Sequence, residues 1–149
     1  MSFMIPHSLK VEHDALHAEL VKATQEEGKV GEAARRVARV LHAHFVKEEE
    51  YALPPLGLLS RLAQGQVTPD MAAVITMTDK LKAELPTMLA EHQDIVAALN
   101  ELAGAAGSEN KPQYAEFAEK LRLHAQTEEE VAYPTALLIG EYVKLKLNR

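Results

Sequence analysis

The chain carries one pattern twice, and this internal repeat constrains its fold more than any other feature. Residues 41–59 read LHAHFVKEEEYALPPLGLL, and residues 121–139 read LRLHAQTEEEVAYPTALLI. Each copy has a His, a Glu four residues later and a Pro six residues after that Glu; the pairs are His44 with Glu48 and His124 with Glu128. The repeat predicts two similar halves that each present a His and a Glu one helical turn apart.

The segments that precede the two copies also match. Residues 12–20 read EHDALHAEL and residues 91–99 read EHQDIVAAL, so that His13 and His92 occupy equivalent positions 79 residues apart. Each half therefore supplies a lone His followed by a His–Glu pair, and both residue types bind transition metals. This arrangement predicts a metal centre held between the two halves.

Apolar residues recur three and four positions apart through most of the chain, which indicates amphipathic helices. We expect an all-α fold, an up-down-up-down four-helix bundle with a pseudo-two-fold internal repeat and a kinked C-terminal extension. The expected helices span about 8–27, 31–52, 69–103 with a kink at Pro86, and 112–147 with a kink or break at Pro134. The segment 104–110 (GAAGSEN) is predicted to be a turn.

Length and composition limit the remaining possibilities. The 149 residues, of which 47% are hydrophobic, suit a single domain over 1–149. The absence of cysteine excludes disulfides, thiolate-bound zinc, cysteine-ligated iron–sulfur clusters and cysteine nucleophiles. A net charge of −6 with scattered Lys and Arg argues against a nucleic-acid partner. No apolar run approaches the ~18 residues of a membrane helix, and the first residues lack a signal-peptide pattern, so we expect no membrane partner and a cytoplasmic location.

Six polar residues fall on the helix stripes that should face the core. They are His13, His44, Glu48, His92, His124 and Glu128, and no Lys or Arg shares their stripes. A buried carboxylate is costly unless it is paired, hydrogen-bonded or bound to a metal. A metal is the simplest compensation, and nitrogen with carboxylate donors suits iron, manganese or zinc better than calcium or magnesium.

The number of donors suits two metals. Six ligands exceed the four of a tetrahedral zinc site. If Glu48 and Glu128 each bridge both ions and each ion takes two His, every metal has four protein donors. A bridging oxo or hydroxo adds a fifth and leaves one position open on each metal for a small ligand such as dioxygen.

These motifs resemble those of hemerythrin-like proteins of the HHE cation-binding class. The resemblance covers about residues 8–139 and rests on Glu12-His13, His44-x-x-x-Glu48-Glu49 with Pro54, and their counterparts Glu91-His92 and His124-x-x-x-Glu128-Glu129 with Pro134. It implies a four-helix bundle around a non-haem, oxo-bridged di-iron centre, with manganese or zinc less expected. By this resemblance His13, His44, His92 and His124 are terminal ligands, and Glu48 and Glu128 are bridges.

The chain departs from the oxygen-carrying hemerythrins, which have five His ligands and an Asp. Here Glu128 stands in place of the Asp, and Val96 stands where the second His of a His-x-x-x-His pair is expected. The equivalent position in the first half holds His17, which is a candidate for a fifth His ligand or a pocket residue. Reversible oxygen carriage is therefore left open.

The resemblance implies a protein that binds or senses dioxygen, nitric oxide or peroxide at an open iron position. Alternatives are a di-iron enzyme that turns over peroxide or nitric oxide, an iron-handling or iron–sulfur repair protein, and a metal-free helical interaction module. The expected partner is the small ligand, with a signalling partner or a second copy of the chain as further candidates. We expect Glu49 and Glu129 to lie around the ligands or in solvent, and Glu12 and Glu91 to be exposed.

Overall fold

The computed structural model describes residues 4–149, and all regular elements within this range are helical. The long helices are α1 (His7–Thr24), α2 (Gly28–Lys47), α4 (Ala73–Ser108), α5 (Pro112–Thr127) and α6 (Tyr133–Leu147). A π-helical segment, η4 (Glu128–Ala132), joins α5 to α6. Between α2 and α4 the chain forms the π-helical η1 (Glu48–Ala52), the 3₁₀ segments η2 (Pro54–Leu58) and η3 (Pro69–Ala72), and the short helix α3 (Leu59–Ala63).

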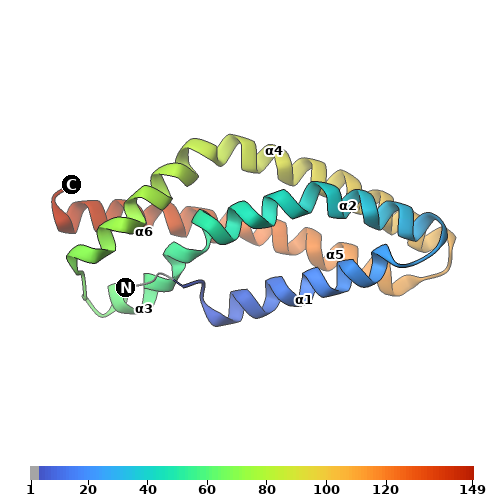
Figure 1. The fold of residues 1–149 in the computed structure, drawn as a ribbon, viewed down its shortest axis with the longest axis horizontal. Helices are drawn as coiled ribbons and strands as arrows, with labels where there is room; N and C mark the ends of the chain where they lie inside the picture. The colour runs from blue at the N-terminus through green and yellow to red at the C-terminus, as the bar shows by residue number, and fades with distance from the viewer. Residues whose placement is uncertain (1–3) are drawn as a thin grey trace.

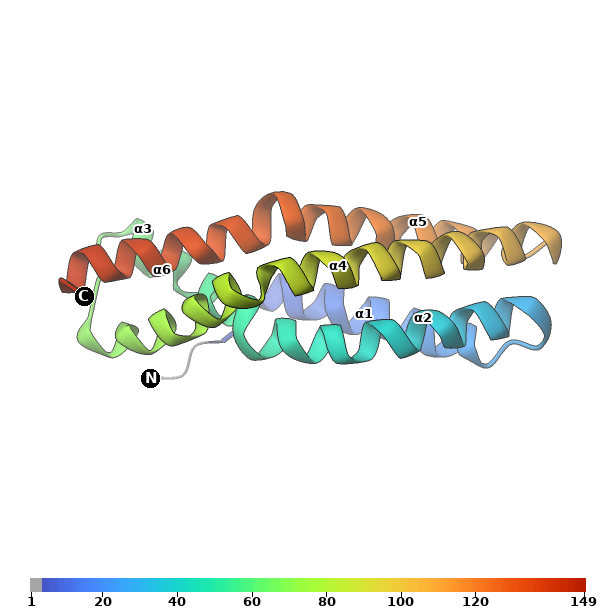
Figure 2. The same ribbon diagram turned by 90° about the horizontal axis from the view of Figure 1, so that it is seen from above.

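Helices α1, α2, the second half of α4, and α5 run side by side and antiparallel to their chain neighbours (Figures 1 and 2). The predicted all-α, up-down-up-down bundle is confirmed. The first half of α4 and the whole of α6 continue beyond the ends of α1 and α2, and they pack against each other there (Figure 1). Gly140 allows this close approach, because a Cβ on it would lie 2.0 Å from Oγ1 of Thr78.

Helix α4 contains Pro86, where a kink was predicted. It also extends into the segment 104–110, where a turn was predicted. Pro86 lies inside the helix, which changes direction in its yellow-green part (Figure 1). The turn predicted at 104–110 is wrong, because α4 continues to Ser108. Two glycines cost a helix only about 1 kcal/mol each, and the buried side chains of Leu102 and Ala106 hold this turn of the helix against the core.

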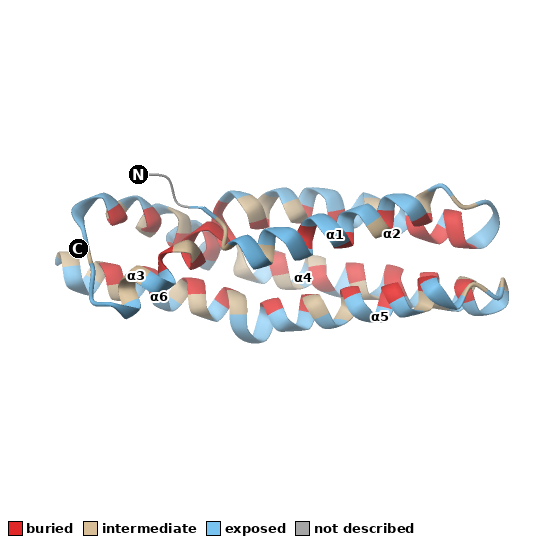
Figure 3. Ribbon diagram, turned by 90° about the horizontal axis from the view of Figure 1, so that it is seen from below, coloured by how far each residue is buried: buried red, intermediate tan, exposed pale blue. Residues whose placement is uncertain are grey.

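Buried residues line the inner faces of the helices, and exposed residues cover the outer faces (Figure 3). They form two apolar clusters. One contains Leu16, Leu41, Ile95 and Leu121, and the other contains Tyr51, Met88, Tyr133 and Ala136. Along α2, α4 and α5 the predicted ligands fall in sequence between these two clusters, so they form a polar layer across the bundle. None of the helices formed by residues 4–149 is both long enough and apolar enough to cross a membrane.

Candidate metal centre

The bundle brings all six residues that the sequence analysis selected into its interior. Each of the four main helical runs contributes to the group. The positions are His13 on α1, His44 on α2 with Glu48 at the start of η1, His92 on α4, and His124 on α5 with Glu128 at the start of η4. Five of these residues are 0–4% exposed, and 9% of the His124 side chain is exposed.

Four of the residues form one candidate metal position, which we name subsite 1. It consists of His44, Glu48, His92 and Glu128, whose ligand atoms all lie within 4.8 Å of one another. Nε2 of His44 lies 3.6 Å from Oε2 of Glu48. Nε2 of His92 lies 3.4 Å from Oε1 of Glu128. These distances leave room for one cation between two imidazoles and two carboxylate oxygens.

A second candidate position, subsite 2, lies on the other side of the same carboxylates. It consists of His13, His124 and Glu128, with ligand atoms again within 4.8 Å of one another. Oε2 of Glu128 lies 3.3 Å from Nε2 of His13 and 3.2 Å from Nε2 of His124. Oε1 of Glu48 adds a fourth donor, 3.8 Å from Nε2 of His13.

The two carboxylates divide their oxygens between the subsites. In Glu128, Oε1 faces His92 and Oε2 faces His13 and His124. In Glu48, Oε2 faces His44 and Oε1 faces His13. The internal repeat exchanges these positions, because it relates His44 to His124 and His13 to His92. Each carboxylate is therefore placed to bridge two cations.

The buried carboxylates and imidazoles of the cluster shift one another's pKa values. Burial and the neighbouring Glu128 carboxylate raise the pKa of Glu48 to about 7. Burial would also raise the pKa of Glu128, but hydrogen bonds from Glu48 and the histidines hold it well below its usual value. Burial opposes protonation of His124, yet the nearby Glu128 carboxylate raises its pKa to about 9.

Buried atoms without hydrogen-bond partners mark the places where a cation fits. Among residues 4–149 these side-chain atoms are Nδ1 of His13, Oε1 of Glu48 and Nε2 of His124. Two of the three, on Glu48 and His124, point into subsite 2. An unpartnered buried acceptor is costly, and a bound metal would satisfy both atoms. The residues present therefore fit a transition-metal site of mixed nitrogen and oxygen donors.

A carboxylate stands behind each imidazole, on the side away from the centre. Oε1 of Glu91 lies 3.0 Å from Nδ1 of His44, and Oε1 of Glu129 lies 2.9 Å from Nδ1 of His92. Glu12 contacts Nδ1 of His124 in the same way. Oε2 of Glu49 is more distant, 4.0 Å from Nδ1 of His13. A carboxylate that accepts the Nδ1 proton leaves the Nε2 lone pair directed at the centre.

The expectation that Glu91 is merely exposed is wrong, because this residue is partly buried between His44 and Lys47, whose Nζ lies 2.8 Å from it. Glu12 is exposed as expected, but it too contacts an imidazole. Both residues precede the lone His of their half, and each reaches the His–Glu helix of the opposite half. The repeated Glu-His dipeptide was the signal for this role.

Tyr133, which was not among the predicted ligands, lies at subsite 1. Its hydroxyl donates a hydrogen bond to Oε2 of Glu48 at 2.7 Å and lies 3.1 Å from Nε2 of both His44 and His92. Burial, followed by the charge of Glu48, raises the pKa of Tyr133 far above its usual value, so the hydroxyl keeps its proton. The repeat concealed this residue, because the equivalent position in the first half is Leu53.

One π-helical turn begins at Glu48 and another at Glu128, and each sets the direction of the side chains that follow. The backbone N–H of Leu53 bonds to the carbonyl of Glu48 at 2.8 Å, and that of Tyr133 bonds to the carbonyl of Glu128, each five residues back. In an α-helix of 3.6 residues per turn, residues five apart differ by about 140° in direction. The wider turn brings Tyr133 back to the face that carries Glu128.

His17 lies outside the cluster. The residue is exposed and lines a surface hollow with His13, His42 and Phe45. The structure therefore does not place it with the donors of either subsite, and it brings His17 into a pocket beside one of them. A role for His17 toward a bound ligand stays a prediction.

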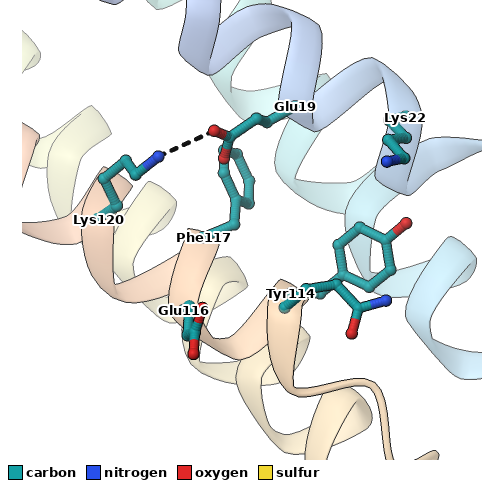
Figure 4. Close-up of a pocket in the computed structure, with 7 residues that line it drawn as sticks. Glu19, Lys22, Tyr114, Glu116, Phe117 and Lys120 are labelled. Carbon is teal, nitrogen blue, oxygen red and sulfur yellow. Dashed lines mark hydrogen bonds and ion pairs between the residues drawn. The ribbon is translucent and has the colours of Figure 1, made fainter.

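A larger hollow lies apart from the cluster, between α1 and α5 (Figure 4). It has a volume of about 340 Å³, and an ion pair of 2.8 Å between Glu19 and Lys120 crosses part of it. None of the six predicted ligands lines it. We assign it no part in the chemistry of the centre.

Comparison with known proteins agrees with this site. The hemerythrin HHE cation-binding domain model matches residues 4–136, which is most of the chain. No curated protein and no solved structure matches the chain. The matched range contains both His-x-x-x-Glu pairs, both lone histidines and Tyr133. The chain therefore belongs to the hemerythrin HHE cation-binding domain family.

Proposed function

We propose that the centre holds two iron ions bridged by Glu48 and Glu128, and that the protein binds or senses dioxygen, nitric oxide or peroxide there. The observation that carries this proposal is the division of each carboxylate between two pairs of imidazoles. One oxygen of Glu128 faces His92, and the other faces His13 and His124. A single-metal site has no need of a second set of donors.

Iron is the proposed metal because the family binds cations and because iron, once bound, can also bind small ligands such as dioxygen. Four imidazole nitrogens and two carboxylates are donors that iron, manganese and zinc accept. Bound iron would supply redox chemistry and a coordination position that the protein leaves open. Zinc would supply no redox chemistry, so the identity of the metal decides between a ligand-binding centre and a structural one.

The surrounding residues have separate tasks in this proposal. The outer carboxylates of Glu12, Glu91 and Glu129 accept the Nδ1 protons and so fix the imidazole rings. The apolar clusters on both sides of the polar layer keep water away from the centre. Tyr133 keeps a proton 2.7 Å from Glu48 and donates it in a hydrogen bond.

Tyr133 also supports a second candidate function, an enzyme that turns over peroxide or nitric oxide. Reduction of either molecule builds negative charge on its atoms, and the buried Tyr133 hydroxyl, which keeps its proton beside subsite 1, is a positioned hydrogen-bond donor for that charge. A reversible ligand-binding protein has less use for such a group. Turnover of added peroxide or nitric oxide, measured per iron, separates the two functions.

The proposed function is tested by the iron content and the ultraviolet–visible spectrum of protein expressed with added iron. We expect about two irons per chain and oxo-to-iron charge-transfer bands, with further bands when azide is added. One metal per chain, zinc alone, or no metal after reconstitution contradicts the di-iron proposal. Two irons with a spectrum that azide, peroxide and nitric oxide all leave unchanged contradicts the small-ligand role.

A further inference from the structure

A surface hollow between α1 and α2 reaches one of the two subsites. It has a volume of about 180 Å³ and is lined by His13, Asp14, His17, His42, Phe45, Val46 and Glu49. Because a water molecule occupies about 30 Å³ in the liquid, the hollow has room for several molecules of that size. His13 is a donor of subsite 2 and is only 2% exposed, so the hollow ends at the wall of the centre.

Phe45 lines this hollow beside His13, a donor of subsite 2. Its ring stacks on the ring of His13, with centroids 4.5 Å apart and an interplanar angle of 20°. Phe45 is partly buried and lines the hollow, and its ring covers one face of the His13 imidazole. The equivalent residue of the second half is Ala125, so this ring stack exists on one side of the pseudo-two-fold only.

The two subsites also differ in the hydrogen-bond partners that surround them. At subsite 1 the Tyr133 hydroxyl occupies the space beside His44 and His92. At subsite 2 the buried atoms Oε1 of Glu48 and Nε2 of His124 have no hydrogen-bond partner. Subsite 2 therefore has the less saturated surroundings, and it is also the one next to the hollow.

We propose that small exogenous ligands reach the centre through the α1–α2 hollow, bind at subsite 2, and are limited in rate and size by Phe45. This inference rests on the proposed function and adds the place of binding and the residue that controls it. The ligands are molecules of two or three heavy atoms, such as dioxygen, nitric oxide, peroxide or azide. His17 stands at the exposed part of the entrance rather than in the centre.

A second hollow offers the competing route. It lies between α1 and α5, has a volume of about 260 Å³ and is lined by Glu12, Leu16, Lys120, Leu123, His124 and Thr127. Two of these lining residues, Glu12 and His124, contact each other through Nδ1 of the imidazole. Leu123 is 56% exposed, so this route can be narrowed or widened without disturbing the core.

The test uses iron-loaded protein and the rate at which azide changes the charge-transfer spectrum in a stopped-flow instrument. Phe45→Ala should raise the azide association rate by about tenfold and raise the rate for the longer thiocyanate more than that for azide. Phe45→Leu should give an intermediate rate. His17→Trp, a change at an exposed position, should slow azide binding and so tests the route even if Phe45→Ala fails to load iron.

Leu123→Ala and Leu123→Trp are the matched controls on the competing route, and they should leave the azide rate within about twofold of that of the parent protein. Unchanged rates in the Phe45 and His17 variants, with altered rates in the Leu123 variants, would overturn the proposed entrance. Failure of the proposed function looks different. In that case the parent protein itself shows no azide band or does not hold two irons.

Discussion

Tyr133 donates a hydrogen bond of 2.7 Å to the Glu48 carboxylate, although the two residues are 85 positions apart and belong to opposite halves of the repeat. The first half has Leu53 where the second has Tyr133. The pseudo-two-fold therefore describes the imidazoles and carboxylates but fails at this hydroxyl. Two cations bound in the centre would have different neighbours, one a phenol and the other the Phe45–His13 stack.

Replacing Tyr133 with phenylalanine should destabilise the protein prepared without metal by about 1–3 kcal/mol, because the buried Glu48 carboxylate loses its hydrogen-bond donor. Urea denaturation of the metal-free protein measures this change. Tyr51→Phe is the matched control. The Tyr51 hydroxyl is also buried, but it donates to the thioether of Met88 at 3.7 Å, a weak bond, so its removal should cost less than about 1 kcal/mol. Equal losses in both variants would contradict the role assigned to Tyr133.

Glu128→Gln should weaken metal binding at both subsites, whereas His44→Ala should weaken it chiefly at subsite 1. The reason is that Glu128 offers one oxygen to each subsite, while His44 faces only the first. Metal analysis after dialysis against a weak chelator gives the stoichiometry. Glu130→Gln, a change at an exposed residue two positions away, should retain the parent metal content. Loss of only one metal in Glu128→Gln would show that this carboxylate does not bridge.

Glu91→Ala and Glu129→Ala should each lower metal affinity by about 10–100-fold while the bundle stays folded, because each carboxylate orients one imidazole from outside. Competition with a coloured chelator measures the affinity, and far-ultraviolet circular dichroism checks the fold. Glu101→Ala removes a surface ion pair with Arg36 that has no imidazole in it, and it should leave the affinity unchanged. A similar loss of affinity in all three variants would point to general charge rather than to orientation.

The stabilisation that metal gives should grow as the pH rises. In the protein without metal, the pKa of Glu48 is raised from 4.5 to about 7 and that of His124 from 6.5 to about 9. Folding without metal therefore takes up protons, and its stability falls as the pH rises between about 4.5 and 9. Metal requires the deprotonated donors, so its binding strengthens over the same range. The Tm difference between the two forms, measured at several pH values, should increase from pH 5 to pH 8; a constant difference would contradict this linkage.

The sequence predicted the cluster well because burying its polar and charged side chains without partners costs free energy. A carboxylate such as Glu48 on an apolar stripe needs a partner. Its repetition as Glu128 at the equivalent position argues against a chance occurrence. Burial of all six residues followed from helical spacing alone. The bundle followed from the same spacing, since four long amphipathic helices with short connections have few other ways to bury their stripes.

Features that depend on contacts between distant segments could not be predicted from helical spacing. Glu91 lies one residue off its stripe, and only the approach of α2 to α4 gives it His44 and Lys47 as partners. Tyr133 could not be assigned from the sequence, because no local rule distinguishes a buried tyrosine that packs from one that donates a hydrogen bond. The turn expected at 104–110 failed because tertiary packing of Leu102 and Ala106 outweighed the local preference of two glycines.

The π-helical turns after Glu48 and Glu128 make the centre depend on residue count as well as residue type. Tyr133 is the fifth residue after Glu128, and in an ordinary α-helix it would point about 140° away from that carboxylate, whereas the fourth residue would differ by only about 40°. A chain without the wider turn would therefore need its tyrosine one position earlier to reach the same place. Related chains that share the His and Glu residues should therefore be compared by the spacing after each Glu before their tyrosines are equated. In this fold, a hydroxyl reaches the centre only when the helical turn and the residue spacing after Glu128 agree.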